Sequence, residues 1–174
     1  MAIRRKMIRK VVVEILKRTG INRPPITVER IAKELKIRVR FEPFEGNLSG
    51  CIVRQGDHVT IGINSFHHKN RQRFTLAHEI GHFFLHKGEE VIVDRAFRVN
   101  LRNSEAAKAE NPEEIEANYF AAELLMPTSF LLGDLEGREI DIESDEQIRD
   151  LSSRYEVSPQ ALSYRLTNLG YLHR

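Results

Sequence analysis

The sequence predicts an α+β fold, because two kinds of apolar pattern follow one another along the chain. Apolar residues recur at helical spacing before residue 36 and after residue 65, whereas the residues between them alternate as in β-strands. The chain has 174 residues, of which 41% are hydrophobic and 30% are charged. These values are typical of a globular protein, and no apolar run approaches the roughly 20 residues of a transmembrane helix. We therefore expect a domain over residues 1–136 and a helical segment over residues 137–174 packed on it.

Two basic helices are predicted before residue 36. The first ends near Gly20, and the second begins after Thr27, a favourable N-cap residue. Glu14 interrupts the apolar run that follows the basic start, which argues against a signal peptide, and the single cysteine, Cys51, fits a reducing cytoplasm. Residues 1–40 carry 13 Lys and Arg against three Glu, a net charge of +10, and the remainder carries −8. Such a region can contact nucleic acid or an acidic partner, but solvated helix surfaces balanced by the acidic remainder explain it more simply.

A small sheet of about three strands is predicted between residues 37 and 64. The stretch "IRVRFEPF" alternates, and "SGCIVRQGDHVTIGIN" has the pattern of two antiparallel strands around a turn at Gly56-Asp57. Cys51 is then a small apolar residue within a strand.

The rest of the chain is predicted to be largely helical. A long helix covers residues 66–87 and is closed by Gly88, whereas residues 89–110 have no clear pattern and are expected to be irregular or mobile. Residue types that cap or stop helices then predict one helix between Asn111 and Pro127, a short one over residues 128–136, and two tail helices that begin at Ser144 and at Ser158-Pro159.

The stretch "FTLAHEIGHFFLH" in the long helix carries three histidines spaced four residues apart. His78 and His82 share one helix face, so that both imidazoles can reach one zinc ion, and Glu79 is placed to act on water at the metal. His86 is about 12 Å along the axis from His78 and cannot share its metal. It is either a residue of the site that supports the ligands or part of the scaffold. Gly81 indicates either close approach of another element or of substrate, or a tolerated tight helix crossing.

A third zinc ligand is expected from the helix "NPEEIEANYFAAELLMP". Glu114 shares its helix face with two alanines that allow close approach, and Asn118, one turn on, can hydrogen-bond a ligating group. Glu113 and Glu116 have an alternative explanation, because acidic residues are favoured near a helix N-terminus. Glu123 lies too far along the helix and is expected to be solvated.

The stretches "RQRFTLAHEIGHFFLH" and "EEIEANYFAAELLMP" together resemble the ImmA/IrrE family of zinc metallopeptidases. The resemblance runs from about residue 31 to residue 127 and implies that Glu114 is the third zinc ligand. It further implies a minimal thermolysin-like, gluzincin-type core with an active-site helix, a cytoplasmic location and cleavage of helix-turn-helix repressors.

The reaction expected from these residues is hydrolysis of a peptide bond with Zn²⁺ as cofactor. Glu79 is the expected general base, and Tyr119 or His86 is a candidate helper whose role the sequence does not assign. The protein target is expected to be a helix-turn-helix repressor, and no membrane association is expected.

An alternative hypothesis is a zinc-containing regulatory protein that binds a partner or DNA without proteolysis. The tail "LSSRYEVSPQALSYRLTNLG" resembles a helix-turn-helix motif, in which the helix after Ser158 takes the recognition position. However, residues 144–174 carry four Arg and four acidic residues, whereas a DNA-reading module normally has a basic footprint. Direct binding of nucleic acid is therefore the less favoured interpretation and stays open.

Overall fold

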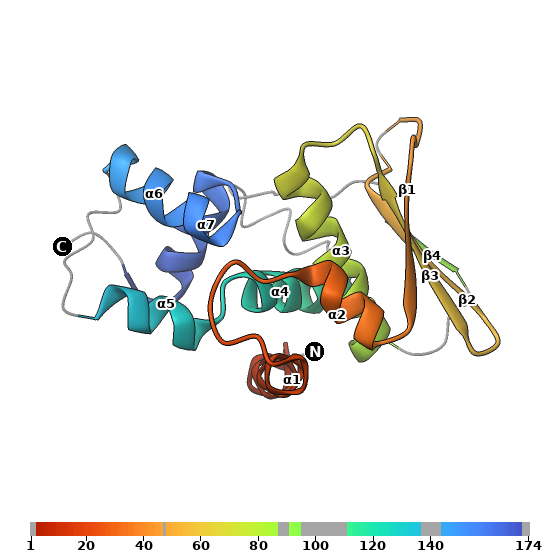
Figure 1. Ribbon diagram of the computed structural model, residues 1–174, viewed down its shortest axis with the longest axis horizontal. Helices are drawn as coiled ribbons and strands as arrows, with labels where there is room; N and C mark the ends of the chain where they lie inside the picture. The colour runs from red at the N-terminus through yellow and green to blue at the C-terminus, as the bar shows by residue number, and fades with distance from the viewer. Residues whose placement is uncertain (1–2, 47, 87–90, 95–110, 137–143, 172–174) are drawn as a thin grey trace.

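The protein was analysed as a computed structural model, which describes residues 3–46, 48–86, 91–94, 111–136 and 144–171. In Figure 1 a small sheet lies at one end of the molecule and three C-terminal helices lie at the other. Two central helices, α3 (Lys69–Leu85) and α4 (Pro112–Leu125), lie between them and pack against each other.

Two N-terminal helices support this central pair. Helix α1 (Arg5–Thr19) packs against α4, and α2 (Val28–Glu34) packs against α3 and the first strand. Gly20 ends α1 in the left-handed conformation, with φ of 66°, as its position in the sequence predicts. Thr27 stands at the predicted N-cap of α2, although its side chain makes no capping hydrogen bond.

The sheet has four strands in the order β1-β3-β2-β4. The predicted strands are present as β1 (Ile37–Glu42), β2 (Gly50–Gln55) and β3 (His58–Asn64). Strands β2 and β3 form the predicted antiparallel hairpin, and β1 runs parallel to β3.

The fourth strand corrects two predictions. Strand β4 (Val91–Asp94) pairs antiparallel with β2, so the sheet is larger than three strands and this part of residues 89–110 is regular. Its "VIVD" sequence is rich in β-branched residues, but four residues are too few to establish a strand without knowledge of the neighbouring edge. The predicted cap Gly88 and residues 95–110 lie outside the described residues.

Helix α3 is slightly shorter than predicted. The ring of His68 accepts a hydrogen bond from the backbone N–H of Asn70 and so caps the first turn, and His86 follows the last helical residue. Helix α4 begins as predicted, because the side chain of Asn111 accepts from the N–H of Glu113.

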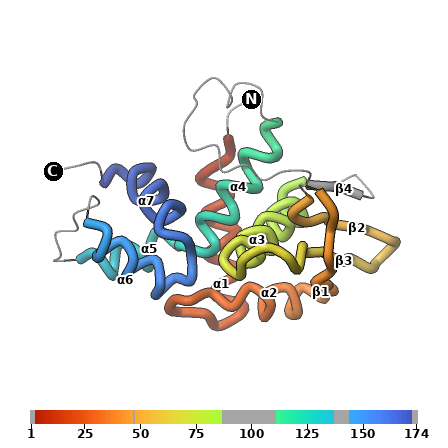
Figure 2. Tube along the Cα trace, turned by 90° about the horizontal axis from the view of Figure 1, so that it is seen from above, coloured from red at the N-terminus to blue at the C-terminus, as the bar shows by residue number. Residues whose placement is uncertain are grey.

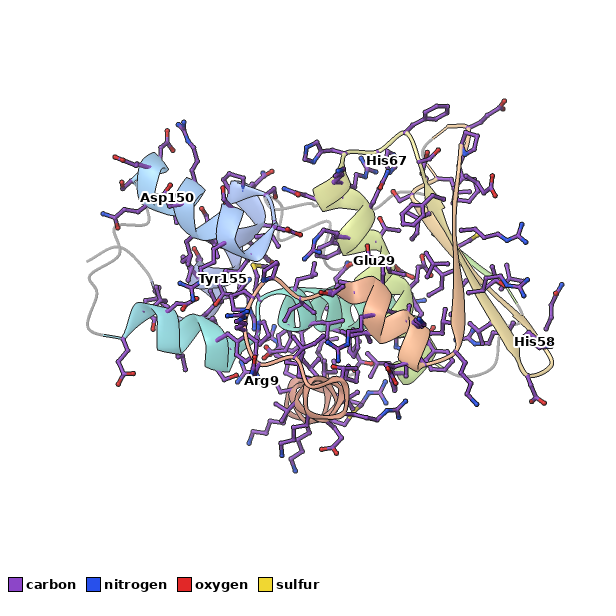
Figure 3. All side chains as sticks on the ribbon, viewed as in Figure 1. Arg9, Glu29, His58, His67, Asp150 and Tyr155 are labelled. Carbon is purple, nitrogen blue, oxygen red and sulfur yellow. The ribbon has the colours of Figure 1, made fainter. Side chains whose placement is uncertain are left out.

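The C-terminal helices are α5 (Thr128–Leu135), α6 (Asp145–Tyr155) and α7 (Pro159–Asn168). Ser144 and Ser158 cap α6 and α7 through their side-chain oxygens, as predicted. In Figure 3 the labelled Tyr155 lies among these helices, and its hydroxyl donates to Asp134 at 2.8 Å. The resemblance of these helices to a helix-turn-helix motif stays a prediction. Among the described residues, no helix has both the length and the apolar character needed to cross a membrane.

One hydrophobic core joins these elements. Figure 2 shows α4 lying beside both α1 and α3, with the sheet on the far side of α3. Fully buried residues of this core come from α1, α2, the sheet, α3 and α4, for example Ile8, Ile31, Ile61, Ile80 and Leu124. The two central helices are therefore held from several sides, which fixes the side chains between them.

Candidate metal centre

Two histidine nitrogens of α3 point to a common position. His78 and His82 lie one helical turn apart and are each only 1% exposed. Their Nε2 atoms are 3.0 Å apart. The helical spacing of the histidine row thus brings two nitrogen donors together in a buried place.

Helix α4 adds a carboxylate to these nitrogens. The carboxylate oxygens of Glu114 lie 3.3 Å from Nε2 of His78 and 3.2 Å from Nε2 of His82. Burial alone raises the pKa of Glu114, but its hydrogen bonds with the two histidines outweigh burial and hold the pKa well below its ordinary value. Glu114 is therefore an anionic donor at this position.

The close approach of α3 and α4 depends on small residues. A Cβ atom at Gly81 would lie 3.2 Å from Cα of Ala117 and 3.3 Å from its carbonyl oxygen. These distances are shorter than ordinary carbon contacts of about 3.5–4.0 Å. The structure shows a close crossing of α3 with α4 at Gly81, so the element that approaches this glycine is another helix.

Asn118 orients the first histidine. Its side-chain oxygen lies 2.8 Å from Nδ1 of His78. Because an amide oxygen only accepts hydrogen bonds, Nδ1 of His78 carries the proton and Nε2 keeps its lone pair for a metal.

A longer chain of contacts begins at the second histidine. Nδ1 of His82 lies 3.0 Å from Nδ1 of His86, which is itself buried, and Nε2 of His86 lies 3.4 Å from a carboxylate oxygen of Glu116. Glu116 accepts hydrogen bonds from the backbone N–H and the Nε–H of Arg4, both at 2.9 Å. His86 therefore contacts a candidate ligand from outside the donor group, and it is held there by residues from α4 and the start of α1.

Arg4 balances the negative charge of Glu116 in this chain of contacts. The hydrogen bond from the Arg4 side chain lowers the pKa of Glu116 to about 2. Burial lowers the pKa of His86, and the hydrogen bond with Glu116 opposes that effect. The interpretation of Glu116 as an acidic residue favoured only by the helix N-terminus is therefore incomplete, because its side chain is buried and paired.

Glu79 lies fully buried next to the sheet. A Cβ atom at Gly50 of β2 would lie 3.2 Å from Oε1 of Glu79 and 2.5 Å from Cγ2 of Thr75. The missing side chain at Gly50 thus leaves room for the Glu79 carboxylate. Burial raises the pKa of the Cys51 thiol on the same strand, and the charge of Glu79 raises it further.

Two residues of α4 make contacts with other helices that the sequence does not indicate. The hydroxyl of Tyr119 accepts a hydrogen bond from Nε of Arg9 at 2.8 Å, so Tyr119 faces α1. In Figure 3 the labelled Arg9 lies where α1 meets the other helices. Glu123 is only 3% exposed and pairs with Arg165 of α7, so the prediction that it is solvated is wrong. The sequence carried no signal for either contact, because the partners are 110 and 42 residues away.

The donor group fits a zinc ion. His78, His82 and Glu114 each offer one ligand atom, and these atoms lie within 4.8 Å of one another. Ligands of a tetrahedral zinc with bonds of about 2.0–2.1 Å are separated by roughly 3.3 Å. The separations of 3.0, 3.3 and 3.2 Å are close to that value. Among the described residues this group offers three donors, which would leave the fourth position of a tetrahedral ion open, as in catalytic rather than structural zinc sites.

Comparisons with known proteins agree with this chemistry. The family model of the IrrE N-terminal-like domain, a peptidase family, matches residues 32–167. The radiation response metalloprotease IrrE of Deinococcus radiodurans is 34% identical over 112 residues, which are 64% of this chain and 31% of that protein. The chain thus spans less than a third of the length of this curated relative.

A solved structure shares the fold. A transcriptional regulator of Mycobacterium tuberculosis superposes with a TM-score of 0.58 at 14% identity, over 93% of this chain and 46% of that one. At this level of identity the likeness concerns the fold alone.

Proposed function

The chain belongs to the family of the IrrE N-terminal-like domain, and from this membership we propose that it is a zinc-dependent metallo-endopeptidase acting on a specific protein target. One observation carries the proposal. Three donor atoms from His78, His82 and Glu114 converge, and Glu79, which follows His78 directly on α3, is a fully buried carboxylate. A structural zinc would be served by four protein ligands and has no need of an adjacent base.

The residues around the donors have distinct roles in this proposal. His78, His82 and Glu114 would hold the zinc, which when bound supplies Lewis-acid polarisation of the scissile carbonyl and lowers the pKa of a water molecule toward about 7. Glu79 accepts the proton of the attacking water at its carboxylate and passes it to the leaving nitrogen. Asn118 keeps the imidazole of His78 in the required orientation and tautomer.

Two substitutions test metal binding and chemistry separately. Glu79→Gln keeps the shape and size of the side chain, but the amide cannot accept a proton. We therefore expect full zinc content and a cleavage rate lower by about 10²–10⁴-fold. Glu113→Gln is the matched control, because it makes the same change at an exposed neighbour of the donor group and should leave both unchanged. Metal analysis and mass spectrometry of the digest measure the two quantities. Full cleavage by Glu79→Gln would refute the assigned mechanism.

The third ligand has its own test. Glu114→Ala is expected to lose zinc at a chelator concentration that leaves the wild-type chain loaded, because only two nitrogen donors remain. Unchanged zinc content in this variant would transfer the ligand role to another carboxylate.

The target that we propose is a helix-turn-helix transcriptional repressor. The support is the family membership, together with a centre whose two histidine donors are buried, so that contacts elsewhere must bring a scissile bond to it. Binding energy from remote contacts can be required for reaction, which makes a folded partner a better substrate than an isolated peptide. Incubation with a candidate helix-turn-helix repressor, compared with casein at equal concentration, tests the proposal. Efficient digestion of casein at many sites would contradict a narrow target.

A further inference from the structure

A cavity of about 660 Å³ lies next to the candidate metal centre. It is bounded by the first turns of α3, by α4, by α7 and by the side chains of Arg5 and Arg9 on α1. Its floor and walls include several apolar side chains from three of these helices, among them Phe74, Ile115, Leu125, Met126 and Tyr164.

The cavity continues the helix faces that carry the metal donors. Phe74 lies one turn before His78 on α3, and Asn118 lies one turn after Glu114 on α4, so each pair shares a helix face. Asn118 both lines the cavity and contacts His78. A helical turn advances about 5.4 Å, which is comparable to the advance of two residues in an extended peptide. A substrate held at the metal donors therefore reaches the cavity with an adjacent side chain.

The charged groups around the cavity have one sign. Four arginines line it, and no Asp or Glu belongs to the described residues of its lining. Arg165 is compensated by the buried Glu123, and Arg9 lies 3.6 Å from the same carboxylate. The ion pairs within the described part of the chain involve neither Arg5 nor Arg71.

Neutral groups hold Arg5 and Arg71, the two lining arginines that have no ion pair with any residue that the structure describes. The guanidinium of Arg5 lies 5.6 Å from the centre of the Tyr119 ring, and a guanidinium nitrogen of Arg71 donates to the hydroxyl of Ser49 at 2.8 Å. These contacts position the two guanidinium groups without cancelling their charge. The remaining donor hydrogens of each guanidinium are suited to a carboxylate, which an Arg binds through two parallel hydrogen bonds.

We propose that this cavity binds the part of the protein substrate next to the scissile bond, and that it selects a large apolar side chain flanked by carboxylates. The inference rests on the proposed peptidase function. The apolar walls bury the side chain, while Arg5 and Arg71 bind aspartate or glutamate residues beside it. Charge complementarity and the apolar walls together favour an acidic peptide segment over a nucleic acid, whose phosphates would gain nothing from Phe74 or Leu125.

A binding selection with a catalytically silent protein tests this assignment. Zinc-loaded Glu79→Gln is used to select short random peptides from a display library, and the enriched sequences are determined. We expect Asp and Glu to be enriched beside Leu, Phe or Met. In the background of Glu79→Gln, the double charge reversal of Arg5→Glu with Arg71→Glu should shift the enrichment to Lys and Arg, and it should weaken the strongest acidic peptide by at least about tenfold. Lys6→Glu with Lys10→Glu, at two exposed residues of α1 that do not line the cavity, is the charge-matched control and should change neither result.

A second variant tests the apolar part of the site without changing charge. Ala161 lines the cavity from the first turn of α7 and is partly exposed, so the larger side chain in Ala161→Trp should fill part of the cavity. We expect it to abolish binding of the selected peptide while circular dichroism and zinc content stay as in the parent protein.

Several outcomes would overturn the assignment. These are enrichment without acidic residues, enrichment that the double charge reversal leaves unchanged, unimpaired binding by Ala161→Trp, and absence of any enriched peptide. A single-stranded oligonucleotide that displaces the selected peptide and binds more tightly than it does would assign the cavity to nucleic acid instead. The selection uses Glu79→Gln, which is expected to bind without cutting, so its result does not depend on hydrolysis. Failure of the zinc-loaded wild type to hydrolyse any repressor would contradict the proposed function, but it would not contradict peptide binding in the cavity.

Discussion

Gly81 is the position where one added methyl group most directly tests the packing of α3 against α4. A Cβ atom there would lie 3.1 Å from Cδ1 of Phe120, 3.2 Å from Cα of Ala117 and 3.3 Å from the Ala117 carbonyl oxygen. Two of these three atoms belong to helix backbone, which cannot rotate away as a side chain can. Relief therefore requires α4 to move by a few tenths of an ångström.

The expected free-energy change of Gly81→Ala combines two opposing contributions. Replacing Gly by Ala inside a helix stabilises it by about 1 kcal/mol, and overpacking a well-packed contact costs about 1–3 kcal/mol. We expect a net loss of about 1 kcal/mol in the free energy of unfolding. Gly133, in α5, has no atom within 4 Å of the position of an added Cβ. Gly133→Ala is therefore the matched control, expected to gain up to about 1 kcal/mol from helix propensity alone.

Urea unfolding of the metal-free variants measures this difference, which should be about 2 kcal/mol between the two substitutions. Zinc affinity, measured by competition with a chelator, adds a functional readout. Movement of α4 displaces Glu114 relative to the two histidines, so Gly81→Ala should bind zinc more weakly and Gly133→Ala should bind it like the wild type. A Gly81→Ala variant as stable as Gly133→Ala, with unchanged zinc affinity, would show that the crossing of α3 and α4 is not constrained as described.

Three further predictions concern side chains around the metal centre and in the core. His86→Phe should keep all three donors but lower zinc affinity by about 10–100-fold in a chelator competition, and unchanged affinity would separate His86 from the centre. Because Arg4 holds the pKa of Glu116 at about 2, below its ordinary value of 4.5, the pair stabilises the fold above that ordinary value and the contribution is lost as the pH falls toward 2. The free energy of unfolding of Arg4→Met, measured with urea, should therefore fall less over this acid range than that of the wild type. An equal fall in both proteins would refute the pairing. Arg165→Met removes the buried cation that pairs with Glu123 and leaves it, among the described residues, only the hydrogen bonds from Thr128 and the more distant Arg9, so the substitution should cost about 3 kcal/mol in the same assay. A loss below about 1 kcal/mol would indicate that Glu123 becomes solvated.

Local sequence signals predicted most of the secondary structure because each depends on a few neighbouring residues. Asn111, Ser144 and Ser158 begin helices since their side chains accept hydrogen bonds from nearby backbone N–H groups. The alternating pattern around Gly56-Asp57 likewise predicted the hairpin. Strand β4 was missed because a short strand is defined by the edge with which it pairs, and that edge lies about 40 residues earlier in the chain.

The candidate metal centre shows the same division between local and distant signals. The convergence of His78 and His82 follows from helix geometry, and a facing carboxylate was expected on α4. The partners of Glu116 and Glu123 were not predictable, because an acidic residue on a helix has the same local pattern whether it is solvated or buried against an arginine from another helix. Only the path of the chain in three dimensions brings Arg4 and Arg165 to them.

The position of α1 determines where a truncated fragment of this protein can begin and still fold. The family match begins at residue 32, so a truncation designed on that boundary would discard Arg4 together with the buried apolar side chains of α1, including Ile8 and Val12. Such a fragment would expose the surface of α4 that α1 covers, and it would release the carboxylate that holds His86. We therefore expect fragments that begin after α1 to be insoluble or to bind metal weakly. Transfer of the histidine helix to another scaffold should likewise require Arg4 and α1.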